Sequence, residues 1–369
     1  MKVWKNVNVY YSNLDKLILD CVEPTMNEKH EQIVDWFWDR HYAGGMHLRI
    51  RFKCSQNESE ALIGELTDVF ERFLLAHPLP AQKSYDVNRV EQMLQKEEEE
   101  YTPEDLLFRT NCVVNRPYLR FQEKYLSQES VYFLEDFYCE AKPLCLQMMR
   151  SNDQKTVSML KLYFLTALML GKSYPAGVVG YRSHWEGFRM QMAEQNVGVL
   201  DAIEKVFRSN KSNLEELMLV IEKQHRGEET PCDLLLESWG KLINKYRTRA
   251  LELFDRGVPI LPQFNSEEEL DVVRNKYARQ KEKSEFVERL YEDKRFFLAI
   301  KDSRSFTGNR IVLTMLYNMV GLLGLSMMEK FQLCYLAHQT VENYFQSDSL
   351  EILAANIRET IAEHTEEST

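Results

Sequence analysis

The stretch that decides the fold runs from Trp36 to Lys53 and reads WFWDRHYAGGMHLRIRFK. Its glycine pair, Gly44-Gly45, predicts a turn, and the residues at 46–54 alternate between polar and apolar as a β-strand does. Along a strand every second side chain points to the same face. The set on one face is His47, Arg49 and Arg51. The set on the other face is Met46, Leu48, Ile50 and Phe52.

The polar set on this strand has two interpretations. Arg49 and Arg51 lie two residues apart, so they can present two guanidinium forks to one carboxylate, phosphate or peptide oxyanion. A half-buried strand with an ordinary polar outer face would show the same alternation. The strand pattern alone leaves both an anion site and a solvated face open.

The composition indicates a globular protein with a substantial core. The chain has 369 residues, of which 44% are hydrophobic and 11% aromatic. Lysine and arginine number 46 against 57 aspartates and glutamates, which gives a net charge of -11. Because a phosphate backbone requires clustered positive charge, this balance weighs against nucleic acid as a partner.

Cysteine usage and hydropathy point to a cytoplasmic protein. The seven cysteines are scattered and form no CxxC pair, which favours reduced thiols over a disulfide framework or a zinc site. The N-terminal residues MKVWKNVNVYY are strand-like and contain no apolar signal segment. The most apolar stretch, Ile311 to Met328, is interrupted by polar residues, so we expect a buried helix rather than a membrane span or membrane contact.

The first part of the chain mixes strands and helices. Residue alternation and helical spacing predict strands at 3–11, 46–54, 83–88 and 112–121, and helices at 14–22, 28–40 and 59–75. The acidic run from Lys96 to Asp105 is interpreted as a solvated loop or helix end, with a regulatory acidic tail as the alternative.

From about residue 128 helical periodicity dominates. Helices are predicted at 129–150, 154–171, 180–194, 198–208, 213–225, 232–255, 267–278, 284–301, 308–324, 326–346 and 349–363. We therefore predict an α+β fold in which a small lobe with a mixed or antiparallel sheet, 1–125, is followed by a helical body, 126–369. The two parts are expected to form one compact functional unit.

Several segments together resemble one protein family. GGMHLRIRF resembles the GPHLRLRF strand of the lantibiotic dehydratase C-terminal family, also called the thiopeptide-type bacteriocin biosynthesis domain. The opening WKNVNVYYSNLDKLILDCVEP and the aromatic WFWDRHYAGG resemble the segments that surround that strand in the family. Later matches, in the family's order, are YLRFQEKY at 118–125, YRSHWEGF at 181–188 and TMLYNMVG at 314–321.

The resemblance implies work on a ribosomally made peptide. Family members eliminate glutamate from glutamylated serine or threonine to leave a dehydroamino acid, and standalone relatives join two dehydroalanines into a pyridine ring. By the same resemblance, Arg49 and Arg51 hold the departing glutamate. Elimination also requires a base and further polar groups. At the positions where the family has Glu, Arg and His, this chain has Phe121, Lys124 and Thr314.

These departures favour the ring-forming reaction. Threonine cannot carry a proton near neutral pH as histidine does, whereas a cyclase needs chiefly to hold two reacting groups together beside a hydrogen-bond donor and an acid or base. A glutamate lyase with a rearranged site is the first alternative. A scaffold that binds the leader peptide without catalysis is the second.

The candidate site residues fall into two groups. The proposed catalytic residues are His47, His184, Tyr181, Tyr317 and Asn318. The proposed substrate-binding residues are Arg49, Arg51, Arg120, Lys124, Thr314, Trp36 and Trp38. Each also has a structural interpretation: the histidines could support a strand or cap a helix, the aromatic rings could pack in the core, and the Asn318 amide could be bonded inside a helix.

The expected partners follow from this reading. They are a precursor peptide with its leader and modified core, and the other peptide-modifying enzymes of the pathway. A homodimer is left open as the oligomeric state. The chain lacks the motifs of nucleotide-binding proteins, zinc proteases and serine hydrolases, so we predict no cofactor and no metal.

Overall fold

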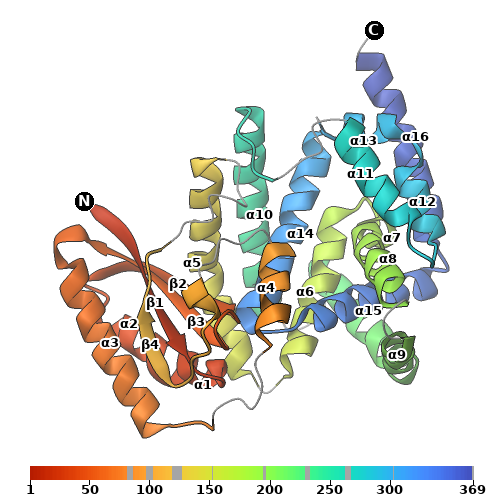
Figure 1. Cartoon of the computed structure of the whole chain (residues 1–369). Helices are drawn as coiled ribbons and strands as arrows, with labels where there is room; N and C mark the ends of the chain where they lie inside the picture. Colours follow the sequence, from red (N-terminus) through yellow and green to blue (C-terminus); the bar gives the residue numbers. More distant parts are fainter. Residues whose placement is uncertain are drawn as a thin grey trace. The chain divides into compact units, whose positions relative to one another are not determined.

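The computed structural model describes residues 1–80, 86–96, 103–118, 127–151, 153–193, 197–228, 233–261, 267–301 and 303–367. It divides into two units, Met1–Met149 and Arg150–Thr369 (Figure 1). The first unit contains a four-stranded sheet and the second is built from helices. This confirms the α+β class, with an antiparallel sheet in place of the mixed or antiparallel alternative. The predicted lobe ends before the long helix α5, which lies in the first unit.

The sheet of the first unit has the order β2-β3-β1-β4, with all neighbours antiparallel. Its strands are β1 (Lys2–Tyr10), β2 (Ile33–His41), β3 (His47–Ser55) and β4 (Cys112–Asn115). Strands β2 and β3 form a hairpin that closes through Gly44 and Gly45, whose φ angles are +70° and +116°. These positive values explain the glycine pair, because residues with a Cβ atom rarely adopt them.

The prediction of a helix at 28–40 is wrong, because most of that segment is strand β2. Trp36, Phe37 and Trp38 are all buried, so both faces of the strand are covered. A strand that is buried on both faces shows no alternation of polar and apolar residues, which hides its period of two. The aromatic residues themselves favour a strand, and pairing with β3 fixes their register.

Helices flank the sheet. The segment after β1 forms α1 (Leu14–Leu17), a π-helix (Ile18–Val22) and α2 (Glu23–Glu28), and α3 (Ser59–Ala76) follows β3. Helix α3 contacts β1 and β4. The unit also contains α4 (Val87–Lys96), a 3-10 helix (Pro103–Leu106) and α5 (Gln128–Arg150).

Two further strand predictions need correction. Residues 87 and 88 belong to helix α4, and 81–85 lie outside the described residues, so no strand forms at 86–88. The high helix propensity of the following VEQMLQK residues explains this difference. Of the strand predicted at 112–121, the described residues 112–118 form only β4, and Pro117 prevents its simple extension because proline lacks an N–H donor; residues 119–121 lie outside the described ranges. Most of the predicted acidic loop, 97–102, lies outside the described residues.

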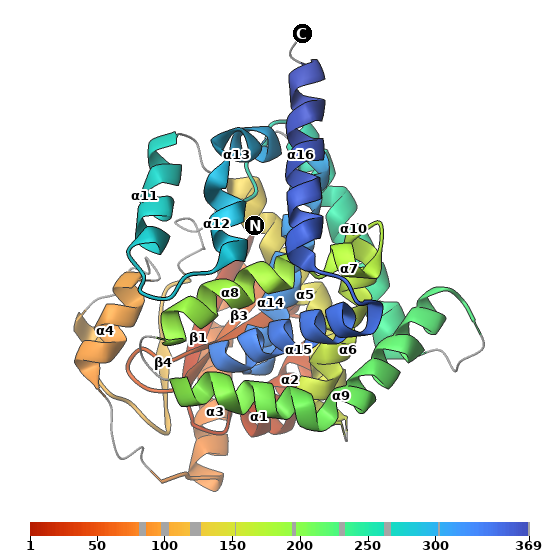
Figure 2. The same ribbon diagram turned by 90° about the vertical axis from the view of Figure 1, so that its right-hand side faces the viewer.

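The second unit consists of helices only, within the residues that are described. In chain order they are α6 (Lys155–Leu170), α7 (Tyr174–Gly177), α8 (Val179–Ala193), α9 (Val197–His225), α10 (Leu234–Asp255), α11 (Glu267–Ala278), α12 (Glu285–Glu292), α13 (Lys294–Lys301), α14 (Arg304–Leu323), α15 (Met327–Phe345) and α16 (Ser349–Glu367). Helix α15 contacts α6, α8 and α9, and Figure 2 shows α8, α15 and α9 in neighbouring rows.

Most helix boundaries agree with the sequence prediction, with two corrections. The predicted helices 198–208 and 213–225 are one helix, α9, because the intervening SNKS residues are polar but contain no glycine or proline. The predicted helix 284–301 is broken at Asp293, where the backbone is extended, into α12 and α13. Side-chain oxygens of Ser284 and Asp293 accept hydrogen bonds from backbone N–H groups of the following residues.

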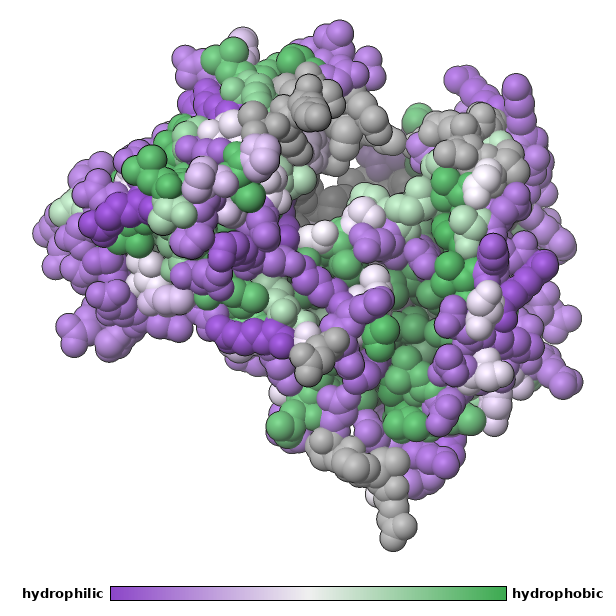
Figure 3. Space-filling view, turned by 90° about the horizontal axis from the view of Figure 1, so that it is seen from below, coloured by the Kyte–Doolittle hydropathy of each residue, from purple (hydrophilic) through white to green (hydrophobic). Residues whose placement is uncertain are grey.

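The apolar stretch from Ile311 to Met328 is mostly the buried part of α14. That helix ends at Gly324 in the left-handed conformation, and Ser326 with Glu329 caps the start of α15. None of the helices in the described ranges has the length and apolarity needed to cross a membrane. Polar and charged residues cover most of the face seen in Figure 3, with apolar residues gathered in smaller patches.

Candidate functional site

The register of the sheet builds one polar face from three strands. The rows of paired residues on this face are Tyr10, His47 and His41, then Asn8, Arg49 and Asp39, and then Asn6, Arg51 and Phe37. Both arginines of the GGMHLRIRF segment therefore belong to one continuous surface of the sheet. Their surroundings, however, differ from one row to the next.

Arg51 is part of the core of the first unit. Its side chain is 4% exposed, and its guanidinium carbon lies 4.9 Å from the ring centroid of Tyr118 and 5.6 Å from that of Phe37. Its Nη2 lies 3.4 Å from Oδ1 of Asp39. Tyr138 of α5 stacks on Phe37 with 5.3 Å between the ring centroids. A cation enclosed in this way holds the sheet to its surroundings and is little available to a ligand.

Arg49 is the more accessible cation of the pair, with 22% of its side chain exposed. Its Nη2 donates a hydrogen bond to Nδ1 of His41 at 2.9 Å, and its Nη1 lies 3.7 Å from Oδ2 of Asp39. The backbone N–H of Ala43 also points to Nδ1 of His41, at 3.3 Å. Two donors to Nδ1 assign the ring proton of a neutral His41 to Nε2.

His47 and the two tryptophans have structural surroundings. His47 is 1% exposed, its Nδ1 lies 2.9 Å from the carbonyl oxygen of Gly45, and its ring packs 4.4 Å from Tyr10. Trp36 and Trp38 are buried with their ring centroids 5.8 Å apart. The ammonium of Lys142 covers Trp36, 4.3 Å from the ring centroid, and donates to the Trp36 carbonyl at 2.8 Å. These positions favour support of the hairpin over direct contact with substrate.

The second unit brings together three tyrosines from different helices. Tyr163 of α6 lies 5.0 Å from Tyr181 of α8 and 6.2 Å from Tyr317 of α14, measured between ring centroids. Tyr181 is completely buried and its hydroxyl donates to the carbonyl oxygen of Tyr163 at 2.9 Å. Burial raises the pKa of all three phenols well above the ordinary value. Tyr181 therefore fastens α8 to α6 and is unsuited to transfer a proton.

His184, Tyr317 and Lys330 form a group that we call the α8–α14–α15 site. The His184 ring stands nearly perpendicular to the Tyr317 ring, with 4.8 Å between their centroids. Lys330 Nζ lies 4.1 Å from the Tyr317 ring centroid and 5.1 Å from that of Phe331. This geometry is a cation–π contact. Within the described part of the chain, Lys330 forms no ion pair with a carboxylate.

Burial away from solvent water and the positive charge of Lys330 set the protonation states in this site. His184 retains exposed surface, yet many protein atoms crowd it; desolvation and the Lys330 cation lower its pKa, so the imidazole is neutral near pH 7. Burial also lowers the pKa of Lys330. The hydroxyl of Tyr317 lies 3.7 Å from Sγ of Cys334, and burial raises the pKa of this thiol to about 11.

Two other predicted residues lie on α14. Asn318 Nδ2 is buried and has no hydrogen-bond partner among the described residues. Thr314 donates its hydroxyl proton to the carbonyl oxygen of Arg310 at 2.9 Å. An i to i−4 bond of this kind occupies the threonine hydroxyl, so the side chain of Thr314 is committed to its own helix.

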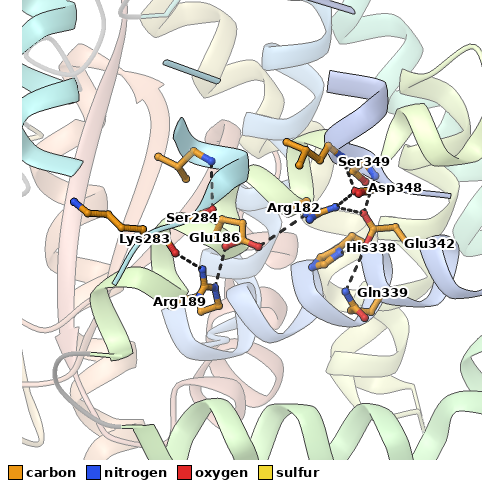
Figure 4. Close-up of polar contacts among 12 residues, drawn as sticks. Arg182, Glu186, Arg189, Lys283, Ser284, His338, Gln339, Glu342, Asp348 and Ser349 are labelled. Carbon is orange, nitrogen blue, oxygen red and sulfur yellow. Dashed lines mark hydrogen bonds and ion pairs between the residues drawn. The ribbon is translucent and has the colours of Figure 1, made fainter. Parts of the chain in front are cut away.

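A polar network next to this site fixes helix α8 (Figure 4). Arg182 Nη1 lies 2.9 Å from Oε1 of Glu342 on α15 and 2.5 Å from Oδ1 of Asp348, just before α16. Glu342 Oε2 also lies 3.1 Å from Nδ1 of His338, and its Oε1 accepts from the backbone N–H of Ser349. Arg182 belongs to the YRSHWEGF segment, so one role of that segment is to hold α8, and with it His184, in place.

The structure thus gathers some predicted residues and separates others. His184, Tyr181 and Tyr317 lie together in the second unit, whereas His47, Arg49 and Arg51 lie on the sheet of the first. Arg120 and Lys124 lie outside the described residues. Sequence reasoning missed Lys330, Cys334 and Tyr163, because a single lysine, cysteine or tyrosine in a helix carries no motif. No group of three or more metal-ligating side chains occurs among the residues described.

Comparisons with known proteins identify the family and the fold of the chain. The family model described as lantibiotic biosynthesis dehydratase C-terminal matches residues 4–341. Two solved structures share the fold. A pyridine synthase, TbtD, from thiomuracin biosynthesis is 21% identical, with a TM-score of 0.69 over 93% of this chain and 99% of the other. TsrL is 18% identical, with a TM-score of 0.65 over 96% of this chain and 98% of the other.

A sequence search among curated proteins gives no match. The family match nevertheless extends over nearly the whole chain, from the first strand to the end of the α8–α14–α15 site. It confirms the resemblance drawn from GGMHLRIRF, YRSHWEGF and TMLYNMVG. The chain therefore belongs to the lantibiotic biosynthesis dehydratase C-terminal family.

Proposed function

We propose that this protein is a cyclase of the pyridine-synthase kind, which joins two dehydroalanines of a precursor peptide into a six-membered ring and releases the leader peptide. The observation that carries the proposal is the state of α14. Thr314 stands where the family has its catalytic histidine and bonds to its own helix, while Tyr317, one turn later, faces a neutral histidine and the ammonium of Lys330, which forms no ion pair with a described residue. Likeness in fold to the pyridine synthase TbtD supports the same assignment.

The proposed reaction needs little from the protein beyond positioning and proton transfer. One peptide amide must shift a proton from nitrogen to oxygen, the two alkenes must meet, and water and the leader must then depart. Holding the reacting groups together can supply about 7–11 kcal/mol of the barrier. The buried Nδ2 of Asn318 is a hydrogen-bond donor without an acceptor among the described residues.

The test uses a synthetic leader-bearing peptide that contains two dehydroalanines. The expected result is two products, a ring-containing core and a free leader peptide, whose masses together equal that of the substrate less one water. A Tyr317→Leu variant should reduce the rate while its circular dichroism spectrum stays unchanged. An unchanged substrate mass with wild-type protein would exclude the proposal, and tight binding without any change of mass would favour the scaffold instead.

A glutamate-eliminating lyase is the second candidate, and the accessible cation of Arg49 favours it. Arg49 could bind the carboxylate of a departing glutamate, which is the role that the family resemblance assigns to it. The lyase is tested with a glutamylated precursor peptide, from which the enzyme would remove glutamic acid. If the glutamylated peptide keeps its mass while the dehydroalanine peptide cyclises, the lyase reaction is excluded.

In either reaction the partner is a precursor peptide. We place the protein in the cytoplasm beside the other peptide-modifying enzymes of the pathway, with a homodimer as the oligomeric state to be tested by light scattering. Because the charge of the chain is -11, a basic segment in the leader would favour association.

A further inference from the structure

The site on α8, α14 and α15 contains one cation, Lys330, whose charge no side chain among the described residues neutralises. Another partly buried lysine of the second unit, Lys161, has carboxylate partners: it lies 3.2 Å from Asp153 and 3.3 Å from Asp233. Lys330 instead lies against the faces of Tyr317 and Phe331 and forms no ion pair with a described residue. Taking a charge out of water without a partner is costly, so a structural role alone gives no reason for a lysine here.

The side chains next to Lys330 cannot deliver a proton at neutral pH. Burial raises the pKa of Tyr317 well above its ordinary value and that of Cys334 to about 11, so both keep their protons. His184 has already lost its proton because crowding and the adjacent ammonium lower its pKa. Lys330 is different, because burial lowers its pKa toward the range in which an ammonium group gives up a proton.

We propose that Lys330 is the acid and base of the water-loss step. This inference rests on the proposed ring-forming function. After the two dehydroalanines have joined, the ring carries a hydroxyl on the former amide carbon. The ammonium of Lys330 gives a proton to this hydroxyl as the C–O bond breaks, and water leaves with the bonding electron pair. The resulting amine then takes a proton from a ring CH₂ group, whose C–H electrons form the new double bond.

This cycle is balanced without an outside reagent. The ring loses one oxygen and two hydrogens as water, and Lys330 returns to its ammonium form. The ring becomes a dihydropyridine, from which departure of the leader amide gives the aromatic pyridine. Tyr317 holds the ammonium in position through its ring face, and neutral His184 adds no competing positive charge.

Three variants separate this role from a simple need for positive charge. Lys330→Met keeps the apolar stem and removes the charge. Lys330→Arg keeps the charge and the contact with Tyr317, but its guanidinium holds its proton too tightly to transfer it. Lys245→Met is the matched control, because Lys245 is an exposed lysine of α10 whose Nζ lies 5.9 Å from the Tyr246 ring centroid.

The readout is the fate of the peptide with two dehydroalanines. With Lys330→Met and Lys330→Arg, turnover should fall by about 10²- to 10⁴-fold, the range for loss of a general acid or base. The peptide should accumulate as an isomer of unchanged mass that no longer adds thiols at dehydroalanine. With Lys330→Arg the peptide Kd should stay near the wild-type value, and Lys245→Met should behave as wild type.

Two results would overturn the role of Lys330 and leave the proposed ring-forming function standing. One is a Lys330→Arg protein that releases leader at a rate near that of wild type. The other comes from reductive ¹³C-methylation of the folded protein, in which the NMR signal absent from Lys330→Arg identifies Lys330. That signal should titrate below the ordinary lysine range, and titration at an ordinary lysine pKa would contradict the proposed role. Failure of wild type to convert the peptide would instead exclude the proposed function.

Discussion

Arg182 of α8 joins Glu342 of α15 through a contact of 2.9 Å between Nη1 and Oε1. Both side chains are largely buried, and the same arginine also reaches Asp348 at 2.5 Å. Arg182 thus connects α8 with α15 and with the residue just before α16, and it lies two residues before His184. The first prediction follows from this connection.

Arg182→Met should destabilise the protein strongly. Removing the arginine leaves Glu342 as a buried charge with reduced compensation, and loss of one partner from such a pair costs about 3–5 kcal/mol. The measurement is urea unfolding followed by circular dichroism. Arg208→Met is the control, because Arg208 and Glu204 form an exposed pair within α9, for which about 0.5 kcal/mol is expected. Equal midpoints for the two variants would contradict the buried role of Arg182.

The stability should decrease on acidification because of Glu342. Burial alone would raise the pKa of this carboxyl, but contacts with His338, Ser349 and Arg182 prevail and lower the pKa to about 2. Because the pKa of Glu342 is lower in the folded protein than in the unfolded chain, the ionised carboxylate stabilises the folded state at pH values above the unfolded-state pKa. This contribution, about 3 kcal/mol in all, is lost as the pH falls from about 5 toward 2. Measuring the free energy of unfolding across this pH range tests the prediction. Glu342→Gln should make this free energy less dependent on pH, and a variant with the same pH dependence as wild type would refute the prediction.

The two arginines of β3 should respond differently to substitution. Arg51→Met removes an enclosed cation from Asp39, Phe37 and Tyr118, so we expect a loss of about 3 kcal/mol of unfolding free energy. Arg49→Met removes a partly exposed cation and should cost about 1 kcal/mol or less. If Arg49 binds a peptide anion, Arg49→Met should weaken precursor binding, measured by fluorescence anisotropy. Stronger destabilisation by Arg49→Met than by Arg51→Met would reverse this assignment.

Gly45 and Gly64 provide a matched pair of glycine substitutions. Gly45 has φ +116°, and an added Cβ would lie 2.5 Å from the carbonyl oxygen of Arg109, so Gly45→Ala should cost about 2–3 kcal/mol. Gly64 lies inside α3 with open space around it, so Gly64→Ala should stabilise by about 0.5–1 kcal/mol. Thermal melting of both variants measures the difference. A lower melting temperature for Gly64→Ala would contradict the open space around that residue.

The sequence was sufficient to predict elements with clear local periodicity. The strand that carries His47, Arg49 and Arg51 and the turn at Gly44 were predicted because alternation and glycine chemistry are local signals. Strand β2 was missed because its burial on both faces removes alternation. The break at Asp293 was also missed. The helical pattern of the sequence continues through this residue, but its extended backbone ends α12.

The candidate site was only partly predictable for a different reason. His184 and Tyr317 were selected from separate segments, but their contact depends on how α8 and α14 pack, which no local pattern encodes. Lys330 was missed altogether, since its significance comes from the two rings around it and from the lack of an ion pair with any described carboxylate. Arg51 shows the reverse case: its motif suggests a ligand site, whereas burial makes it a structural cation.

The lysine that covers Trp36 also controls how the edge of the sheet can be used. Strand β2 ends the sheet, and its Trp36 carbonyl accepts from Lys142 while its Trp36 N–H donates to Oδ1 of Asp35. An edge strand with unbonded groups can recruit a strand from another chain. Here both groups of Trp36 are already bonded, so an extended peptide or a second copy would have to displace Lys142 and Asp35 before it could pair. Lys142 and Asp35 thereby protect the edge of β2 at Trp36 from pairing with another chain.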